Sequence, residues 1–264
     1  MSTVIQTRAV YVGNGRVLTK ILNGINFVAP SDDLVGSSSL IMDGYYEPTL
    51  TNYIVKNVTA GMTCLDVGAN IGYFTTVLGL ICGPSGRVIA YEANPDLRSL
   101  IKLNVNIHYM GHHVEVVDKA AYSESCRLKF NVCKRVTGNS SIFERLPGYR
   151  ELYDDEIVTI HVEAVPLDER LRTISRVDFM KMDIEGGEYH AFLGMREALA
   201  EGKVRRAAVE WNRDMLAERA EPFLELLDCS FKRMGVLQGD GSVKTTTRSA
   251  VSQTTFIPNL ILER

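Results

Sequence analysis

The chain shows two patterns of hydrophobic and polar positions, and the change between them falls near residue 50. In residues 1–50, short apolar runs are interrupted by Asn14-Gly15 and by Asn23-Gly24. An Asn-Gly pair between two apolar runs is typical of the tight turn in a β-hairpin. We therefore expect a small β-rich N-terminal extension in residues 1–50, with a loop through the serines at 37–39.

From residue 51 onward, apolar runs of strand length alternate with segments of helical periodicity. Strands are predicted at residues 63–67, 87–92, 114–118, 177–183, 206–210, 230–234 and 259–262. Helices are predicted at 71–81, from Asn94-Pro95 onward, at 187–199 and from Glu221-Pro222 onward. This alternation predicts right-handed βαβ units, with helices on both faces of a mostly parallel sheet. The predicted fold class is α/β, with a Rossmann-like domain in residues 51–264.

Composition and charge exclude several classes of function and are consistent with the predicted fold. The 264 residues carry a net charge of −3 and no long basic run, which argues against binding of a nucleic-acid backbone. The five cysteines form no CxxC pair, so neither a disulfide framework nor a zinc site is predicted. No apolar stretch is long enough to span a membrane, and the N-terminus lacks the apolar run of a signal peptide. We expect a cytoplasmic protein.

Acidic residues stand at the ends of the five central strands. They are Asp66, Glu92, Asp118, Asp183 and Glu210. Parallel sheets of this class bind their ligands at the carboxyl ends of the strands. We therefore expect these side chains to line the functional site.

The loop after the first strand, DVGANIG at residues 66–72, predicts the cofactor. Gly68 permits a tight turn and Gly72 close packing of the next helix, but the spacing is not the GxGxxG of dinucleotide folds. Asp66 directly before the turn would repel a pyrophosphate and attract an ammonium group. S-adenosylmethionine (SAM) carries an ammonium and a sulfonium and no phosphate, so SAM is the predicted cofactor.

Other residues near this loop are expected to contact the same cofactor. Glu92 would accept hydrogen bonds from the ribose hydroxyls, as an acid does at this position of such folds. Asp118 would accept one from the adenine amino group. Ala69, Asn70 and Asn94 complete the predicted cofactor-binding residues.

With these motifs in place, the chain resembles the FkbM family of SAM-dependent methyltransferases. The resembling segments follow in order over residues 44–211: GYYEP, LDVGANIG, YEANP, NSS, MKMDIEGGE and VE. The resemblance implies a seven-stranded methyltransferase sheet and O-methylation, often of the hydroxyls of sugars or natural products. It also implies that Glu47, Asp66, Gly68, Asn70 and Glu92 lie near the cofactor. It does not specify the acceptor.

Methyl transfer to a hydroxyl requires alignment and a proton acceptor, because a neutral alcohol is a poor nucleophile. Asp183 is expected to orient the ammonium group of SAM or the acceptor. Glu210 is a candidate base, and His190 titrates in a suitable range. Lys181 is expected on the same buried face as Asp183, where a lysine needs a charged partner. That partner is expected to be Asp66, Asp183 or Glu210.

Several alternatives remain open on the sequence alone. Asp183, Glu210 and Asn212 could supply oxygen ligands to Mg²⁺, although no metal-ligand motif supports this. Residues 131–153 are a candidate lid over the acceptor, and Tyr45, Tyr46 and Trp211 a candidate aromatic wall. A nucleotide-dependent oxidoreductase and a non-catalytic binding module on the same fold are the competing functions. The sequence does not predict an oligomeric state.

Overall fold

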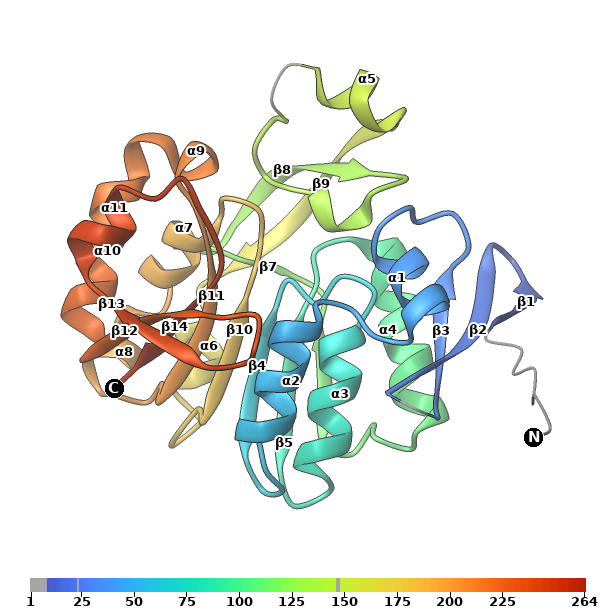
Figure 1. Cartoon of the computed structure of the whole chain (residues 1–264), viewed down its shortest axis with the longest axis horizontal. Helices are drawn as coiled ribbons and strands as arrows, with labels where there is room; N and C mark the ends of the chain where they lie inside the picture. Colours follow the sequence, from blue (N-terminus) through green and yellow to red (C-terminus); the bar gives the residue numbers. More distant parts are fainter. Residues whose placement is uncertain (1–8, 23, 146–147) are drawn as a thin grey trace.

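The fold is seen in a computed structural model that describes residues 9–22, 24–145 and 148–264, and a large sheet forms its centre (Figure 1). Across these residues the sheet has eight strands, in the order β13 (Val243–Thr246), β12 (Arg233–Leu237), β14 (Phe256–Glu263), β11 (Arg206–Asn212), β10 (Phe179–Met182), β4 (Thr63–Val67), β5 (Arg87–Tyr91) and β6 (Val114–Val117). Neighbours from β11 to β6 are parallel, and β14 is antiparallel to both β11 and β12. The predicted Rossmann-like sheet is confirmed, and β13 adds an antiparallel edge strand that was not predicted.

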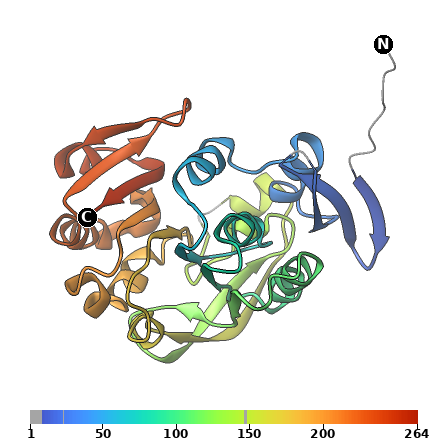
Figure 2. The same ribbon diagram turned by 90° about the horizontal axis from the view of Figure 1, so that it is seen from below.

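Helices cover both faces of this sheet (Figures 1 and 2). One layer consists of α2 (Pro48–Asn57), α3 (Tyr73–Cys82) and α4 (Pro95–Ile107), and the other of α6 (Asp168–Leu171), α7 (Glu188–Leu193), α8 (Arg196–Ala200) and α10 (Ala220–Ser230). The alternation of side chains along each strand separates the two cores. Cys64 packs with the first layer, whereas its neighbour Leu65 packs with the second. The short helices α9 (Arg213–Leu216), η2 (Ala217–Arg219) and α11 (Arg248–Ser252) lie near α10.

Local chemistry explains where the helices begin and end. Asn94 caps α4 by accepting a hydrogen bond from the Asp96 amide at 3.1 Å, as predicted from Asn94-Pro95. The single helix predicted at 187–199 is wrong, because the chain breaks at Gly194 into α7 and α8. A Cβ atom on Gly194 would lie 1.9 Å from the carbonyl oxygen of Tyr122, so the backbone approaches too closely for a side chain here.

The N-terminal part forms a separate antiparallel sheet of β1 (Ala9–Gly13), β2 (Arg16–Ile21) and β3 (Ile25–Pro30). Asn14 and Gly15 both have positive φ in the predicted hairpin turn, whereas Asn23 of the second predicted turn lies outside the described residues. The loop predicted at 37–39 is wrong: helix α1 (Gly36–Asp43) occupies these positions. Its start is fixed by the carboxylate of Asp33, which accepts a hydrogen bond from the Ser37 amide at 2.7 Å.

The division of the chain at residue 50 stays a prediction. Helix α2 runs across that position. Ile21 and Phe27 of the N-terminal sheet also share one apolar core with α2, α3 and α4. The N-terminal sheet and the β12–β14 strands lie at opposite ends of the long axis (Figure 2).

A third sheet lies above the carboxyl ends of the central strands (Figure 1). It consists of β7 (Ala120–Ala121), β9 (Ile157–Val165) and β8 (Cys126–Cys133), and the chain between β8 and β9 contains η1 (Thr137–Asn139) and α5 (Tyr149–Tyr153). The alternation of Leu128, Phe130 and Val132 with polar residues is the signal that could have predicted β8. Among the described residues, no helix combines the length and apolar character that crossing a membrane requires.

Candidate active site

Two adjoining cavities lie at the carboxyl ends of β4 and β10, and they contain about 600 Å³ and 630 Å³ of empty space. Both volumes include space that is open to solvent. The residues that line both cavities are Gly68, Asn70, Gly138, Asp183 and Glu185. The first cavity, which we call the donor cavity, extends to Glu92, Leu97 and Lys119, and the second extends to Tyr46 and Lys181.

The glycine loop brings β4 and β10 close together at this edge. Gly68 has a φ of +80°, and a Cβ atom there would lie 2.0 Å from the carbonyl oxygen of Asp183. The amides of Gly68 and Ala69 both donate to the carbonyl oxygen of Tyr91, at 3.1 and 3.0 Å. Gly72, also at positive φ, lies against Ile101 of α4. The turn and the helix packing predicted for the two glycines are therefore present.

Glu92 is a buried acid at the end of β5 that faces the donor cavity. Its Oε2 accepts a hydrogen bond from the Asn70 amide, and its Oε1 accepts one from the Asn94 amide, both at 2.7 Å. Burial raises the pKa of Glu92 to about 7, although these hydrogen bonds oppose the rise. Each oxygen keeps a further lone pair for a ligand hydroxyl.

Asp66 lies behind the loop and is fully buried. Its Oδ2 accepts a hydrogen bond from the hydroxyl of Thr75 at 2.6 Å, whereas its Oδ1 has no partner among the described residues. Burial raises the pKa of Asp66, and the charge of Lys181 limits the rise. Asp66 does not line either cavity, so any effect on a ligand acts through its charge or through the loop.

Lys181 is a buried lysine in the middle of the central sheet. Its Nζ donates to the carbonyl oxygen of Gly68 at 2.9 Å and lies 3.7 Å from Oδ2 of Asp183. The prediction of a partner among three acids is confirmed with Asp183. Burial alone would lower the pKa of Lys181, but the surrounding carboxylates raise it, so the lysine stays charged.

Three carboxyl groups meet beside this ion pair. Oxygens of Asp183, Glu188 and Glu210 lie within 4.8 Å of one another. Burial, followed by repulsion from Asp183, raises the pKa of Glu210 to about 10. Glu188 instead accepts a hydrogen bond from the Ile184 amide at 2.9 Å and stabilises the start of α7. At neutral pH the Glu210 carboxyl is therefore protonated, since adjacent carboxylates cannot all be ionised.

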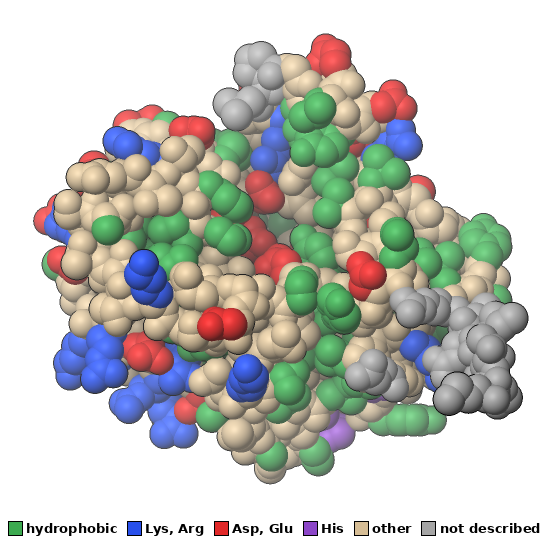
Figure 3. Space-filling view, in the orientation of Figure 1, with side chains coloured by type: hydrophobic (Ala, Val, Ile, Leu, Met, Phe, Trp, Pro, Cys, Tyr) green, Lys and Arg blue, Asp and Glu red, His purple; other side chains and the backbone are tan. Residues whose placement is uncertain are grey.

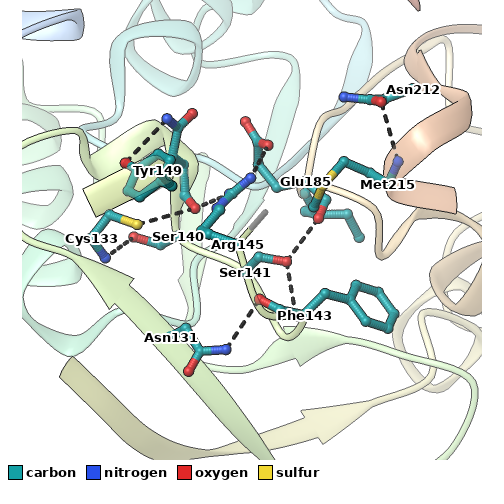
Figure 4. Close-up of polar contacts among 12 residues, drawn as sticks. Asn131, Cys133, Ser140, Ser141, Phe143, Arg145, Tyr149, Glu185, Asn212 and Met215 are labelled. Carbon is teal, nitrogen blue, oxygen red and sulfur yellow. Dashed lines mark hydrogen bonds and ion pairs between the residues drawn. The ribbon is translucent and has the colours of Figure 1, made fainter. Parts of the chain in front are cut away.

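Of the three predicted magnesium ligands, Asp183 and Glu210 come together, whereas Asn212 is engaged elsewhere. The side-chain oxygen of Asn212 accepts a hydrogen bond from the Met215 amide at 3.2 Å and caps α9 (Figure 4). It is therefore committed to the helix, unlike Asp183 and Glu210. A magnesium site formed by these three residues is not supported.

Two other predicted site residues lie apart from the cavities. Asp118 has a side chain that is 65% exposed and pairs with Arg98 at 3.3 Å, while the adjacent Lys119 lines the donor cavity instead. His190 stacks on Tyr122 with ring centroids 4.6 Å apart and lines neither cavity. Burial lowers the pKa of His190. The roles assigned to both residues stay predictions.

The aromatic wall is only partly present. Tyr46 lines the second cavity, and Tyr45 is exposed. Trp211 is a core residue: it is fully buried, stacks on Phe223 and donates from its indole nitrogen to the carbonyl oxygen of Thr254 at 2.8 Å.

Glu47 adopts an unusual backbone conformation beside the same group of acids. It has a φ of 43° and precedes Pro48, a position that disfavours helical conformations. Burial and then repulsion from Asp183 raise the pKa of Glu47 to about 7, whereas Lys181 and a hydrogen bond from Asn259 oppose the rise. Strained residues of this kind are concentrated at functional sites.

Residues 137–145 lie over the donor cavity, and we call this segment the lid. Gly138, Ser140 and Ile142 line that cavity, and the hydroxyl of Thr137 donates to the side-chain oxygen of Asn70 at 2.9 Å. The candidate lid of the sequence analysis, 131–153, was expected over the acceptor, but this part covers the cavity beside the glycine loop. Neither Arg145 nor Glu185 was recognised as a site residue, because their contact joins segments 40 residues apart.

Comparison with known proteins identifies the family at this point. Residues 66–235 match the methyltransferase FkbM domain. The chain belongs to this family. The matched range contains the glycine loop, the acids at the strand ends and the lid, whereas Glu47 precedes it.

Individual relatives are distant. The chain is 27% identical over 84 residues to a protein-L-isoaspartate O-methyltransferase of Caenorhabditis elegans, a match that covers 31% of this chain and 37% of that protein. It is 23% identical over 199 residues to methyltransferase sdnD of Sordaria araneosa, covering 66% of this chain and 75% of that protein.

Solved structures with a similar arrangement include methyltransferase FkbM from Methylobacillus flagellatus. That structure has a TM-score of 0.47 and 16% identity, and the match covers 81% of this chain and 50% of that chain. A SAM-dependent O-methyltransferase from Thermotoga maritima has a TM-score of 0.47 and 13% identity, covering 96% of this chain and 94% of that chain. The chain therefore spans about half of the Methylobacillus protein and 37% of the worm enzyme.

Proposed function

We propose that this FkbM-family protein is an O-methyltransferase that moves the methyl group of SAM to a hydroxyl of a sugar, glycan or natural-product-like small molecule. The observation that carries the proposal is the concentration of buried acids around the glycine loop. Burial raises the pKa of Glu47, Glu92, Glu185 and Glu188 to about 7 in each case. A positively charged ligand would stabilise the ionised form of these acids. A pyrophosphate would instead repel their carboxylates.

The residues present fit SAM as the donor. Glu92, which lines the donor cavity with Asn70, would accept hydrogen bonds from the ribose hydroxyls. The amides of Asn70 and Asn94 hold its carboxylate, and Ala69 would contact the donor from the second cavity. The second cavity, with Lys181 and Asp183, would receive the amino-acid end. The buried Oδ1 of Asp66 lacks a partner among the described residues and lies behind the loop, where a positively charged donor would favour the ionised carboxylate. SAM supplies a methyl group on a positively charged sulfur, which is a good leaving group.

The chain's own residues would align the acceptor and take its proton. Lys181 fixes Asp183 at the end of β10, so that its carboxylate can orient the donor's ammonium group or the acceptor. Glu210 lies within β11, two residues before its end and next to Asp183, and carries a proton at neutral pH. The positive charge of a bound donor would lower this pKa, so Glu210 would release its proton to solvent and could then accept the hydroxyl proton of the acceptor.

The red side chains in Figure 3 mark where the acceptor would enter. Asp and Glu side chains gather in a hollow between the C-terminal elements and the region of α1 and α2, and hydrophobic side chains surround the hollow. An acceptor with several hydroxyls and some apolar surface suits such an opening, because carboxylates accept hydrogen bonds from hydroxyls.

Turnover with a panel of hydroxylated acceptors tests the proposal. Purified protein is incubated with SAM labelled in its methyl group and with sugars, glycosides and polyketide alcohols, and methyl ethers are detected by mass spectrometry. A new O-methyl product supports the proposal. Binding of SAM with no turnover across the panel would favour a non-catalytic module, and binding of NAD in place of SAM would favour an oxidoreductase.

A further inference from the structure

The lid is connected to the turn after β10 by a buried ion pair. Nη1 of Arg145 lies 3.0 Å from Oε2 of Glu185, and the two side chains are only 8% and 17% exposed (Figure 4). A second guanidinium nitrogen of Arg145 donates to the carbonyl oxygen of Asn139, within the lid itself. The guanidinium also lies 5.8 Å from the ring centroid of Tyr149. Arg145 therefore joins both ends of the lid to Glu185.

The backbone of the turn and the lid are connected as well. The hydroxyl of Ser141 donates to the carbonyl oxygen of Glu185 at 2.7 Å, and accepts from the amide of Phe143 at 3.0 Å (Figure 4). Glu185 has a φ of 56°, and Gly186 follows with a φ of 95°. A residue other than glycine keeps such a conformation only where its surroundings enforce it. The lid contacts supply that enforcement.

A further contact holds the middle of the lid against η2. The guanidinium carbon of Arg219 lies 3.8 Å from the ring centroid of Phe143. Arg219 is fixed in turn by donating to the carbonyl oxygens of Met215 and Leu216, at 2.8 and 2.9 Å. The lid is thus closed by side chains that do not themselves line either cavity, namely Arg145 and Arg219.

Burial separates this ion pair from those on the surface. Arg172 and Glu197 form a surface ion pair with two contacts of 2.9 Å, and their side chains are 62% and 56% exposed. Exposed pairs contribute little free energy, because water and salt screen them. Removing one partner of a buried pair leaves an uncompensated charge and is strongly destabilising. Opening the lid would break this contact and separate Glu185 from Arg145.

We infer that Arg145 is a positioning residue that keeps the lid closed over the bound methyl donor through its ion pair with Glu185. The inference rests on the proposed function, because it assigns SAM to the cavity under the lid. A donor in that cavity would contact Gly138, Ser140 and Ile142 of the lid, so opening of the lid would remove contacts that hold it. The stability of the Arg145–Glu185 pair therefore sets how fast the donor and its demethylated product dissociate.

Dissociation of S-adenosylhomocysteine from Arg145→Met tests this inference. Stopped-flow measurements are expected to show a dissociation rate at least tenfold faster than in the unsubstituted protein, with an association rate changed less than twofold. Glu185→Gln should also accelerate dissociation, and the double variant should not exceed the faster single variant, because both remove the same interaction. Arg172→Met, which removes an arginine from the exposed pair, should leave the rate unchanged.

A purely structural role for Arg145 predicts other results. It would lower the melting temperature of Arg145→Met and leave the dissociation rate unchanged, which would overturn the inference. If Arg145→Met does not fold, Arg145→Lys keeps the charge and loses the planar fork, and it should still accelerate dissociation.

Hydrogen exchange on the unsubstituted protein gives an independent readout that needs no variant. Amides of residues 139–145 should gain protection when S-adenosylhomocysteine binds, and unchanged exchange there would contradict closure over the ligand. Failure of the unsubstituted protein to bind S-adenosylhomocysteine would instead refute the proposed function. Binding with identical kinetics in Arg145→Met would refute only the role of the ion pair.

Discussion

Glu210 lies in β11, and two other carboxyl groups are close enough to change its protonation. Burial is the main cause of its raised pKa, and repulsion from Asp183, Glu185 and Glu188 adds to it. Glu188 is committed to the start of α7, and Asp183 is paired with Lys181. Glu210 differs from both, since its Oε2 has no hydrogen-bond partner in the described part of the chain. It is therefore the carboxyl of this group that is most available to a ligand.

Replacing Glu210 tests its role in proton transfer. Glu210→Gln keeps the shape and removes the proton acceptor, so the rate of methyl transfer should fall about 10²–10⁴-fold. Affinity for S-adenosylhomocysteine should change less than twofold, because the donor cavity does not include this side chain. The matched control is Glu225→Gln on the exposed face of α10. A rate for Glu210→Gln equal to that of the control would remove Glu210 from the mechanism.

Protonation of the acids should also change when the donor binds. Glu47, Glu92 and Glu185 each have a pKa raised to about 7, so a fraction of each is protonated at pH 7. A positive charge favours the ionised form and lowers these pKa values, so binding of SAM should release protons. S-adenosylhomocysteine lacks the sulfonium charge and should release fewer. Calorimetry at pH 7 in two buffers of different ionisation enthalpy measures the difference; proton uptake with SAM would contradict the account.

At the scale of elements, β4, the glycine turn and α3 form the unit that positions the site. The turn depends on backbone positions that only glycine fits. Gly68 has both a positive φ and a carbonyl oxygen 2.0 Å from where its Cβ atom would lie, whereas Gly239 has neither constraint. A side chain at Gly68 would therefore push β4 away from the end of β10.

Gly68→Ala should affect both stability and binding. The clash with the backbone of Asp183 cannot be relieved by a side-chain rotation, so we expect the free energy of unfolding to fall by about 2 kcal/mol or more. S-adenosylhomocysteine should bind at least tenfold more weakly to the folded fraction. Urea unfolding and calorimetry measure these effects, with Gly239→Ala as the control. A stable Gly68→Ala variant with unchanged affinity would show that this turn does not shape the cavity.

Sequence patterns predicted the elements whose structure is local. The predicted strand 63–67 coincides with β4, and Asn94-Pro95 begins α4, because alternation and capping depend on neighbouring residues. The break at Gly194 could not be predicted in this way, since it depends on the approach of the Tyr122 backbone from another element. The same holds for α1, whose first turn is fixed by Asp33 and by packing of Leu40 in the core.

The residues of the candidate site likewise include some that the sequence could predict and some that it could not. Its acids could be found because the ends of parallel strands meet at one edge, which brings Asp183 and Glu210 together. Arg145 could not be found, because its position depends on how the β7–β9 sheet places the lid against Glu185. Asp118 was predicted in the site because it follows a strand, but its side chain is exposed and pairs with Arg98.

For the whole molecule, the arrangement of sheets separates two regions around the acids. The donor cavity lies beneath the lid, on the side of β4, β5 and the β7–β9 sheet. The acidic hollow of Figure 3 opens beside it, between the C-terminal elements and α1–α2. This arrangement would let an acceptor approach the acids while the lid stays closed over the donor.

Titration calorimetry with S-adenosylhomocysteine, SAM and NAD tests the central claim most directly. The account predicts one-to-one binding of the first two ligands and none of NAD. Binding should weaken about tenfold or more in Glu92→Gln, which disturbs a charged hydrogen-bond acceptor, and should be unchanged in the control Glu163→Gln on the exposed face of β9. Absence of heat with both SAM and S-adenosylhomocysteine, or binding of NAD instead, would contradict it.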